Sequence, residues 1–175
     1  MNYPAAMIRL ARLDVSGVRE LPANHLPWIC MFHVSILGLI YGGTAAVLSR
    51  DLLWGQGLLK LTLAGIPVAF LMHAGAALFI WVFLKALGGN AGFLTAYFII
   101  GIASISLWPL APFLAMLQTQ ASEPAVVTAA VITGLYALAV NAKIIQDAFN
   151  LSFARMVIAL SAAMIYIGCF LYLWM

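Results

Sequence analysis

Apolar residues fill five long stretches of the chain, and short polar segments separate them. A helix needs about 20 predominantly apolar residues to cross the hydrocarbon core of a bilayer. Stretches of this length lie at about 27–48, 58–84, 91–117, 124–149 and 152–175. Their unbroken character favours helices, because the strands of a membrane barrel would show alternating segments of roughly ten residues. The pattern therefore predicts an all-α polytopic membrane protein with a bundle of five transmembrane helices.

The separating segments contain residues that end helices or form turns. Residues 49–51 are polar, and residues 88–90 read Gly-Gly-Asn, which suits a turn with permissive dihedral angles. Residues 118–123 predict a polar bend, after which Pro124 is acceptable at a first helical position. The last two stretches are separated so closely, by Asn150, that we expect them to form an antiparallel hairpin.

Composition excludes a water-soluble enzyme. The chain has 175 residues, of which 66% are hydrophobic and 7% are charged, whereas a soluble domain has about a quarter charged residues. The formal net charge is +3, but the cations lie mainly between the apolar stretches. This placement indicates contacts with anionic lipid headgroups rather than with nucleic acid.

The distribution of cations predicts the orientation, because short cytoplasmic loops carry an excess of Lys and Arg. With five spans, two cations fall on one side, Arg50 and Lys60, and six fall on the other: Arg9, Arg12, Arg19, Lys85, Lys143 and Arg155. We therefore expect a cytoplasmic N-terminus and, because the number of spans is odd, a C-terminus on the outer side.

Residues 1–26 precede the first stretch and form the predicted cytoplasmic segment. On a helical wheel of residues 2–21 a polar arc faces an apolar arc, and Asp14 is the one misfit. The polar arc contains Asn2, Arg9, Arg12, Ser16, Arg19 and Glu20, and the apolar arc contains Met7, Ile8, Leu10, Ala11, Val15, Val18 and Leu21. This pattern predicts an amphipathic helix in the headgroup layer, with its arginines at the membrane surface. The alternative is a helix that docks on a partner protein.

Two histidines, His33 and His73, fall inside apolar stretches, where ionisable groups are costly. His73 is interpreted as a neutral imidazole bonded to a neighbouring helix, or alternatively as a group for proton transfer or ligation. The expected depths of the two histidines differ by about 9 Å at a rise of 1.5 Å per residue, which argues against one haem held by both. Ligation of a pigment by one histidine stays open, although no cofactor is expected.

A polar cluster is predicted where the fourth stretch ends and the fifth begins. It contains Asn141, Lys143, Asp147 and Arg155. Lys143 and Asp147 have the i,i+4 spacing of a helical ion pair, and Asp147 could also contact Arg155 across the hairpin. The cluster is interpreted as a clasp at headgroup level or, alternatively, as a substrate site.

The third stretch contains Ser104, Ser106 and Trp108 together with two prolines, Pro109 and Pro112. Proline removes a helix hydrogen bond, so these residues predict a kink in the outer half of this helix. The freed carbonyl groups could line a small polar cavity. Passive packing and transport are both compatible with such a helix.

Small residues recur in the first and second stretches, including Gly38, Gly42 and Gly65. They allow close approach of helix backbones in lipid and are expected to serve packing within the bundle, in a homodimer or in a larger complex. The two cysteines, Cys30 and Cys169, lack metal-ligand spacing. The sequence also contains no HExxH motif and no Gly-rich phosphate loop, and no paired carboxylates lie deep in a span. Enzymatic activity is therefore not expected.

Two longer segments resemble the Ypt/Rab-interacting YIP family of five-span membrane proteins, especially its short bacterial members. These are LKALGGNAGFLTAYFIIGIASISLWPLAP at 84–112 and GLYALAVNAKIIQDAFNLSFARMVIAL at 134–160. The resemblance implies a cytoplasmic N-terminus, five spans and no enzymatic activity. Because it is to bacterial members and the chain is short, the bacterial inner membrane is the expected location, with the C-terminus in the periplasm. Eukaryotic members bind small GTPases through a long N-terminal region, which is not found before residue 27 here, so that role is not transferred.

The sequence thus predicts a non-catalytic membrane scaffold or accessory subunit that packs laterally with other membrane subunits. The alternative is a small transporter or channel subunit that works as an oligomer around Pro109, Pro112, His73 and the polar cluster. A weaker alternative is pigment or haem binding through His33 or His73.

Overall fold

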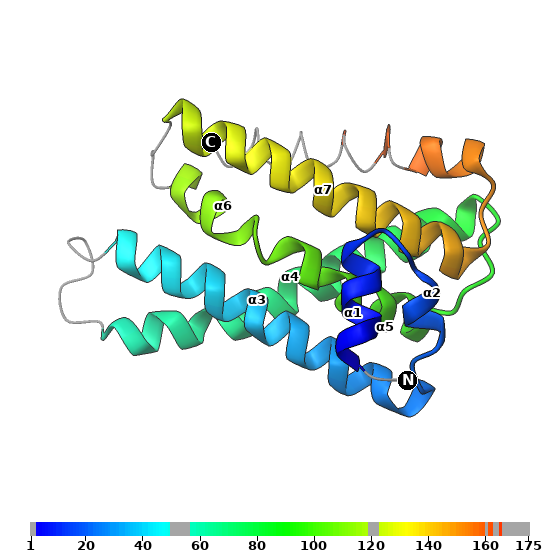
Figure 1. The fold of residues 1–175 in the computed structure, drawn as a ribbon, viewed down its shortest axis with the longest axis horizontal. Coiled ribbons are helices and arrows are strands. Elements are labelled where there is room, and N and C mark those ends of the chain that lie inside the picture. The colour runs from blue at the N-terminus through cyan, green and yellow to red at the C-terminus, as the bar shows by residue number, and fades with distance from the viewer. Residues whose placement is uncertain (1–2, 50–56, 119–122, 160, 163–164, 166–175) are drawn as a thin grey trace.

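The computed structural model describes residues 3–49, 57–118, 123–159, 161–162 and 165 (Figure 1). Within these ranges all regular structure is helical, which confirms the predicted all-α class. The elements are α1 (Tyr3–Ala11), α2 (Ser16–Arg19), the 3-10 helix η1 (Ala23–His25), α3 (Leu26–Leu48), α4 (Leu58–Ala86), α5 (Phe93–Ala103), the 3-10 helix η2 (Ser104–Leu107), α6 (Ala111–Gln118) and α7 (Pro124–Phe149). Residues 153–159 are also helical.

Three of the described helices are long and apolar enough to cross a membrane: α3 together with η1, α4 and α7. The bent pair formed by residues 93–107 and α6 makes a fourth if it counts as one span. The predicted fifth stretch, 152–175, lies largely outside the described residues. The described chain therefore has three to four candidate spans, and a count of five remains a prediction.

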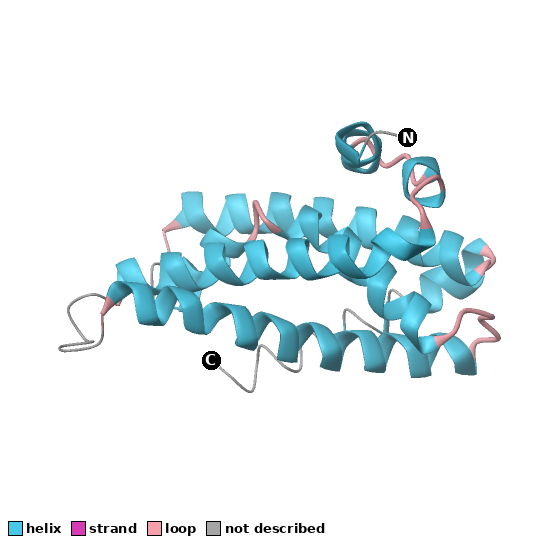
Figure 2. Ribbon diagram, turned by 90° about the horizontal axis from the view of Figure 1, so that it is seen from below, coloured by secondary structure: helices cyan, strands magenta, loops and turns pink. Residues whose placement is uncertain are grey.

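The long helices run antiparallel along one axis (Figure 1). One end of the bundle, called the Leu26 end below, contains the start of α3, the end of α4, the start of α5 and the end of α7. The short helices α1 and α2 lie across the side of the bundle near this end, roughly perpendicular to the long helices (Figure 2).

Three glycines bring α3 and α4 into close contact. A Cβ atom added at Gly38 would lie 2.6 Å from the carbonyl oxygen of Gly65, and one at Gly42 would lie 3.0 Å from the Gly65 Cα. A Cβ at Gly65 would collide with the carbonyl oxygen of Gly38. Close backbone approach of this kind increases van der Waals contact between helices in lipid. These glycines therefore serve packing inside this chain.

The third predicted stretch is broken rather than continuous. Helix α5 passes into η2, and α6 starts at a bend of 74° from residues 93–107. The Ser104 and Ser106 hydroxyls donate 2.7 Å hydrogen bonds to carbonyl oxygens three residues earlier, a side-chain interaction that competes with the α-helical pattern. Pro109 lies in the turn after η2, where it has no N–H to continue the helix. Pro112 is the second residue of α6, where no intrahelical N–H bond is lost.

The prediction of one amphipathic helix over residues 2–21 is wrong. The chain leaves α1 through Leu13, which has a left-handed φ of 63°. The Leu13 amide donates to the Leu10 carbonyl and the Asp14 amide donates to the Arg9 carbonyl, both at 2.9 Å, a pattern that satisfies the last carbonyls of a helix. The Asp14 carboxylate then accepts a 3.0 Å bond from the Ser16 amide. The residue that does not fit the helical wheel is thus part of the turn.

Helix α7 ends in the same way, at Asn150. This residue has φ 51° and ψ 47°, a left-handed conformation that asparagine tolerates better than most residues. The amide of Leu151 donates to the Gln146 carbonyl at 3.0 Å. The turn directs residues 153–159 back alongside the bundle (Figure 1).

Candidate functional site

Residues 3–21, called the N-terminal segment below, pack their apolar side onto the bundle. Ala6 and Leu10 are fully buried, and Val18 and Leu21 are 7% and 8% exposed. All four belong to one hydrophobic cluster with residues of α5 and α7, including Ile102 and Ile144. Part of the apolar arc that was expected to lie in the headgroup layer therefore contacts the chain's own bundle, whereas Ile8 of the same arc is 55% exposed.

Helix α7 provides two hydrogen-bond donors to carbonyl groups at the end of α1 and in the turn that follows it. The Tyr136 hydroxyl donates to the carbonyl oxygen of Ala11 at 3.0 Å, and the Lys143 ammonium donates to that of Leu13 at 3.1 Å. Carbonyls at a helix C-terminus have no intrahelical partner, and a cation there also interacts favourably with the helix dipole. These contacts fix the end of α1 against α7.

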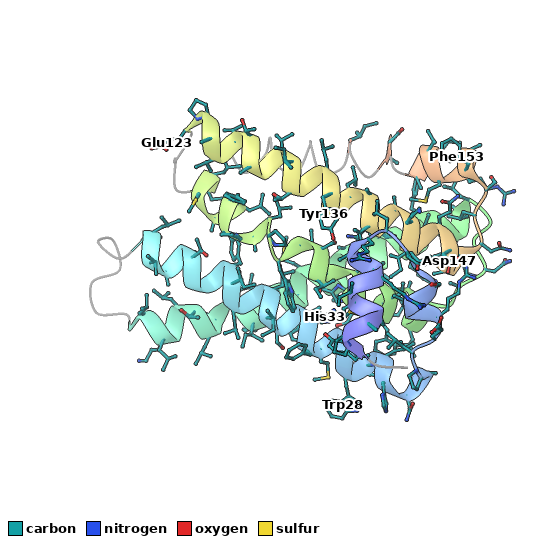
Figure 3. The ribbon with its side chains drawn as sticks, viewed as in Figure 1. Trp28, His33, Glu123, Tyr136, Asp147 and Phe153 are labelled. Carbon is teal, nitrogen blue, oxygen red and sulfur yellow. The ribbon has the colours of Figure 1, made fainter. Side chains whose placement is uncertain are left out.

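An ion pair joins α2 to α7. The Arg19 Nε donates to the Asp147 carboxylate at 2.6 Å, and the two groups form a salt bridge in which Arg19 is 67% exposed and Asp147 is 20% exposed. A second ion pair, Arg9 with Glu20 at 3.2 Å, lies within the N-terminal segment. Arg12 is exposed. Figure 3 shows His33, Tyr136 and Asp147 around the two short helices.

His33 connects α1, α3 and α5. Its Nδ1 lies 2.8 Å from the Ile102 carbonyl oxygen, and its Nε2 lies 2.6 Å from the Tyr3 hydroxyl. Because a carbonyl only accepts, Nδ1 carries the proton and Nε2 accepts from Tyr3. The Trp108 indole donates to the His33 carbonyl oxygen at 3.1 Å. Burial raises the pKa of the Tyr3 hydroxyl. Ligation of a haem or pigment by His33 would therefore require loss of one of these bonds.

His73 has a separate set of partners. Its Nε2 donates to the Tyr97 carbonyl oxygen at 3.0 Å and lies 3.8 Å from the Cys30 sulfur. Gly101 packs directly against both side chains, since a Cβ there would lie 3.1 Å from the His73 Nε2 and would collide with the Cys30 Sγ. His33 and His73 thus do not share a site. Among the described residues, no group of three or more His, Cys, Asp or Glu side chains could hold a metal ion.

The predicted polar cluster is dispersed. The Asn141 amide points inward, donating to the Ser106 hydroxyl at 3.2 Å and to the Ala137 carbonyl at 2.9 Å. Asp147 pairs with Arg19 rather than with Lys143 or Arg155. The guanidinium of Arg155 lies beside Gly88, 3.1 Å from where a Cβ would be. Lys143 and Asp147 do have one feature in common, since both contact the N-terminal segment.

Cavities lie at two of the helix contacts in the described part of the chain. One of about 200 Å³ lies between α3 and α4 and is mainly apolar. The other, of about 280 Å³, lies between the N-terminal segment and the bundle and is lined by Val18, Ile99 and Ile144, with Arg19 and Asp147 among its lining residues. In the described chain, no buried side-chain nitrogen or oxygen lacks a hydrogen-bond partner.

Sequence reasoning did not single out Tyr3 or Tyr136. One signal was available for the second, because Tyr136, Lys143 and Asp147 are spaced by seven and four residues and thus share one face of a helix. No comparable signal marks Tyr3, whose partner lies 30 residues away.

Comparison with protein-family models, curated proteins and solved structures finds no match. The function of the site is therefore inferred from its own geometry. At this site the bundle holds the amphipathic N-terminal segment through apolar contacts, which hydrogen bonds and an ion pair surround.

Proposed function

We propose that this protein is a non-catalytic integral membrane scaffold or accessory subunit that packs laterally with membrane partners. The observation that carries the proposal is the contrast between the interior and the outside of the bundle. Polar groups such as His33, Asn141 and Ser106 are engaged in internal hydrogen bonds. Catalysis by proton transfer needs titratable groups that are open to a substrate, whereas His33 is fully buried and neither Asn141 nor Ser106 titrates in the physiological range.

The outward faces of the long helices support lateral packing. Large apolar side chains there are strongly exposed, such as Leu71 at 75%, Ile132 at 62% and Leu135 at 59%. Such surfaces suit lipid tails or the helices of other subunits. Gly38, Gly42 and Gly65 are already used inside the chain, so a partner would contact other small residues. Gly75 on α4 is one candidate, because a Cβ there would meet nothing within 4 Å.

The proposal includes five spans in the bacterial inner membrane, with the N-terminus in the cytoplasm. The charge bias of six cations to two supports this orientation. The proposal also keeps the YIP family as the proposed relationship, since members of that family have the five spans proposed for this chain. Labelling of a single cysteine at Ala5 with a membrane-impermeant reagent in intact cells tests the orientation. Labelling from outside would contradict it.

Purification in mild detergent followed by mass spectrometry tests the function. A stoichiometric complex with another membrane protein is the expected result, and replacement of the exposed Gly75 by Leu should weaken that complex. Gly57 to Leu is a matched control, because a Cβ at Gly57 also meets nothing within 4 Å but lies just before α4 rather than on its outward face. A bare homo-oligomer that conducts ions in liposomes would refute the proposal.

That second outcome is the alternative function, a transporter or channel subunit. The specific observation in its favour is the broken helix at residues 104–110, bent by 74°, with Ser104, Ser106 and Asn141 around it. Discontinuous helices of this kind form substrate sites in secondary transporters. Reconstituted flux that is lost on replacement of Asn141 by Leu would favour this alternative.

A further inference from the structure

The ion pair that holds α2 on the bundle is unequally exposed. Arg19 is 67% exposed, whereas its partner Asp147 is 20% exposed. The guanidinium can therefore be approached from outside while it is still paired. Asp147 is held on α7 and cannot follow Arg19 if that residue turns away.

Anionic lipid can compete for Arg19 on nearly equal terms. An exposed ion pair contributes little to stability, because water and salt screen it and two side chains lose freedom. A basic side chain near the surface of an anionic leaflet gains a comparable amount of energy. Guanidinium binds phosphate as well as carboxylate in bidentate geometry. The exchange of Asp147 for a lipid phosphate is thus close to balanced.

The bonds from α7 to the end of α1 also permit release. The bonds from Tyr136 and Lys143 end on carbonyl groups at the end of α1, which water or headgroups can satisfy equally well. The apolar side, with Leu10 and Val18, matches the amphipathic pattern of helices that lie in a membrane interface. Release into the headgroup layer would not transfer that side into water.

We propose that the N-terminal segment is a cover that anionic phospholipid opens, with Arg19 exchanging the Asp147 carboxylate for a lipid phosphate. Opening uncovers His33, Tyr136, Lys143 and Asp147 on the side of the bundle, near its Leu26 end. The inference rests on the proposed function in one respect, the placement of this end of the bundle at the cytoplasmic headgroups.

Two substitutions break the same ion pair and should nevertheless differ in their response to lipid. Asp147→Asn leaves Arg19 free, so the cover should open at a lower content of anionic lipid than in the parent protein. Arg19→Gln removes the group that binds the lipid, so the position of the cover should no longer depend on lipid composition. A structural role for the ion pair alone predicts the same behaviour for both variants. Lys85→Gln is the matched control, since it removes one exposed cation from the same end of the bundle.

The position of the cover is measured by double electron–electron resonance between spin labels at Ala5 and Leu135, in the full chain with Cys30 and Cys169 replaced by alanine. Both labelled positions are exposed. Lipid nanodiscs contain either phosphatidylcholine alone or an equal mixture with phosphatidylglycerol. We expect a second, longer distance to appear only with phosphatidylglycerol and to disappear at high salt, which screens exposed charges.

An unchanged distance distribution in the two lipids would overturn the proposal, as would opening by inorganic phosphate in phosphatidylcholine discs. Equal responses of the Arg19→Gln and Asp147→Asn variants would also overturn it. Labelling of Ala5 from outside the cell would contradict the proposed orientation instead. Failure of the inference and failure of the proposed placement can therefore be distinguished.

Discussion

Replacement of Gly101 by alanine tests the packing of α5 against α3 and α4. A Cβ at this position would collide with the Sγ of Cys30 and would lie 3.1 Å from both the Cys30 Cβ and the His73 Nε2. Cys30 is fully buried and His73 is 9% exposed, so neither side chain has free space into which it can turn. The substitution adds one methyl group at a point where three helices meet.

The expected loss follows from two opposing effects. Overpacking of a well-packed core costs about 1–3 kcal/mol, and alanine gains about 0.5–1 kcal/mol over glycine in a helix interior. We therefore expect Gly101→Ala to lower the free energy of unfolding by about 1 kcal/mol, in a range of roughly 0–2.5 kcal/mol. Gly75→Ala is the matched control, because a Cβ at this helical position meets nothing within 4 Å. It should raise the free energy of unfolding by about 0.5–1 kcal/mol.

A double-mutant cycle assigns the loss to the contact with sulfur. Cys30→Ala removes the Sγ, so the double variant should be more stable than the sum of the single effects by about 1 kcal/mol. Unfolding is followed by circular dichroism in mixed micelles with increasing sodium dodecyl sulfate. The reasoning is refuted if Gly101→Ala is as stable as Gly75→Ala, or if the two substitutions at the contact are additive.

Three further predictions concern the glycine contact and the N-terminal segment. Gly65→Ala should cost more than about 2 kcal/mol in the same unfolding assay, because its Cβ would collide with the backbone oxygen of Gly38, which cannot turn aside; stability equal to the parent would contradict this. Tyr3→Phe leaves the His33 Nε2 without its donor, and should weaken docking by about 1–3 kcal/mol, seen as faster hydrogen exchange over residues 5–20. Hydrogen bonds from Ser16 lower the pKa of Asp14 below 3.8. The contribution of the Asp14 carboxylate to docking should therefore be complete above pH 3.8 and should be lost as the pH falls through the lowered pKa. An Asp14→Asn variant should lack this acid-dependent increase in hydrogen exchange.

The sequence by itself determined the helical class and the apolar character of the chain. A continuous run of about 20 apolar residues forms a helix in lipid, because a helix bonds every backbone group within its own segment. This local requirement also placed several helix ends. The predicted stretch 124–149 coincides with α7, Pro124–Phe149, and 27–48 differs from α3, Leu26–Leu48, by one residue. Proline at the first helical position and asparagine after the last are signals that act over a few residues.

Only the tertiary structure decided what the polar residues contact. Helical spacing predicted a pair between Lys143 and Asp147, but Asp147 pairs with Arg19, 128 residues away in sequence. The N-terminal segment was misjudged for a related reason. Amphipathicity shows that one side is apolar, and lipid, a partner or the chain's own bundle can each cover such a side. Its single predicted helix failed at Leu13, where a left-handed turn lets Gly17 of α2 approach Ala6 of α1. Contacts across large separations depend on how helices are arranged in space, and hydrophobic periodicity carries no information on that arrangement.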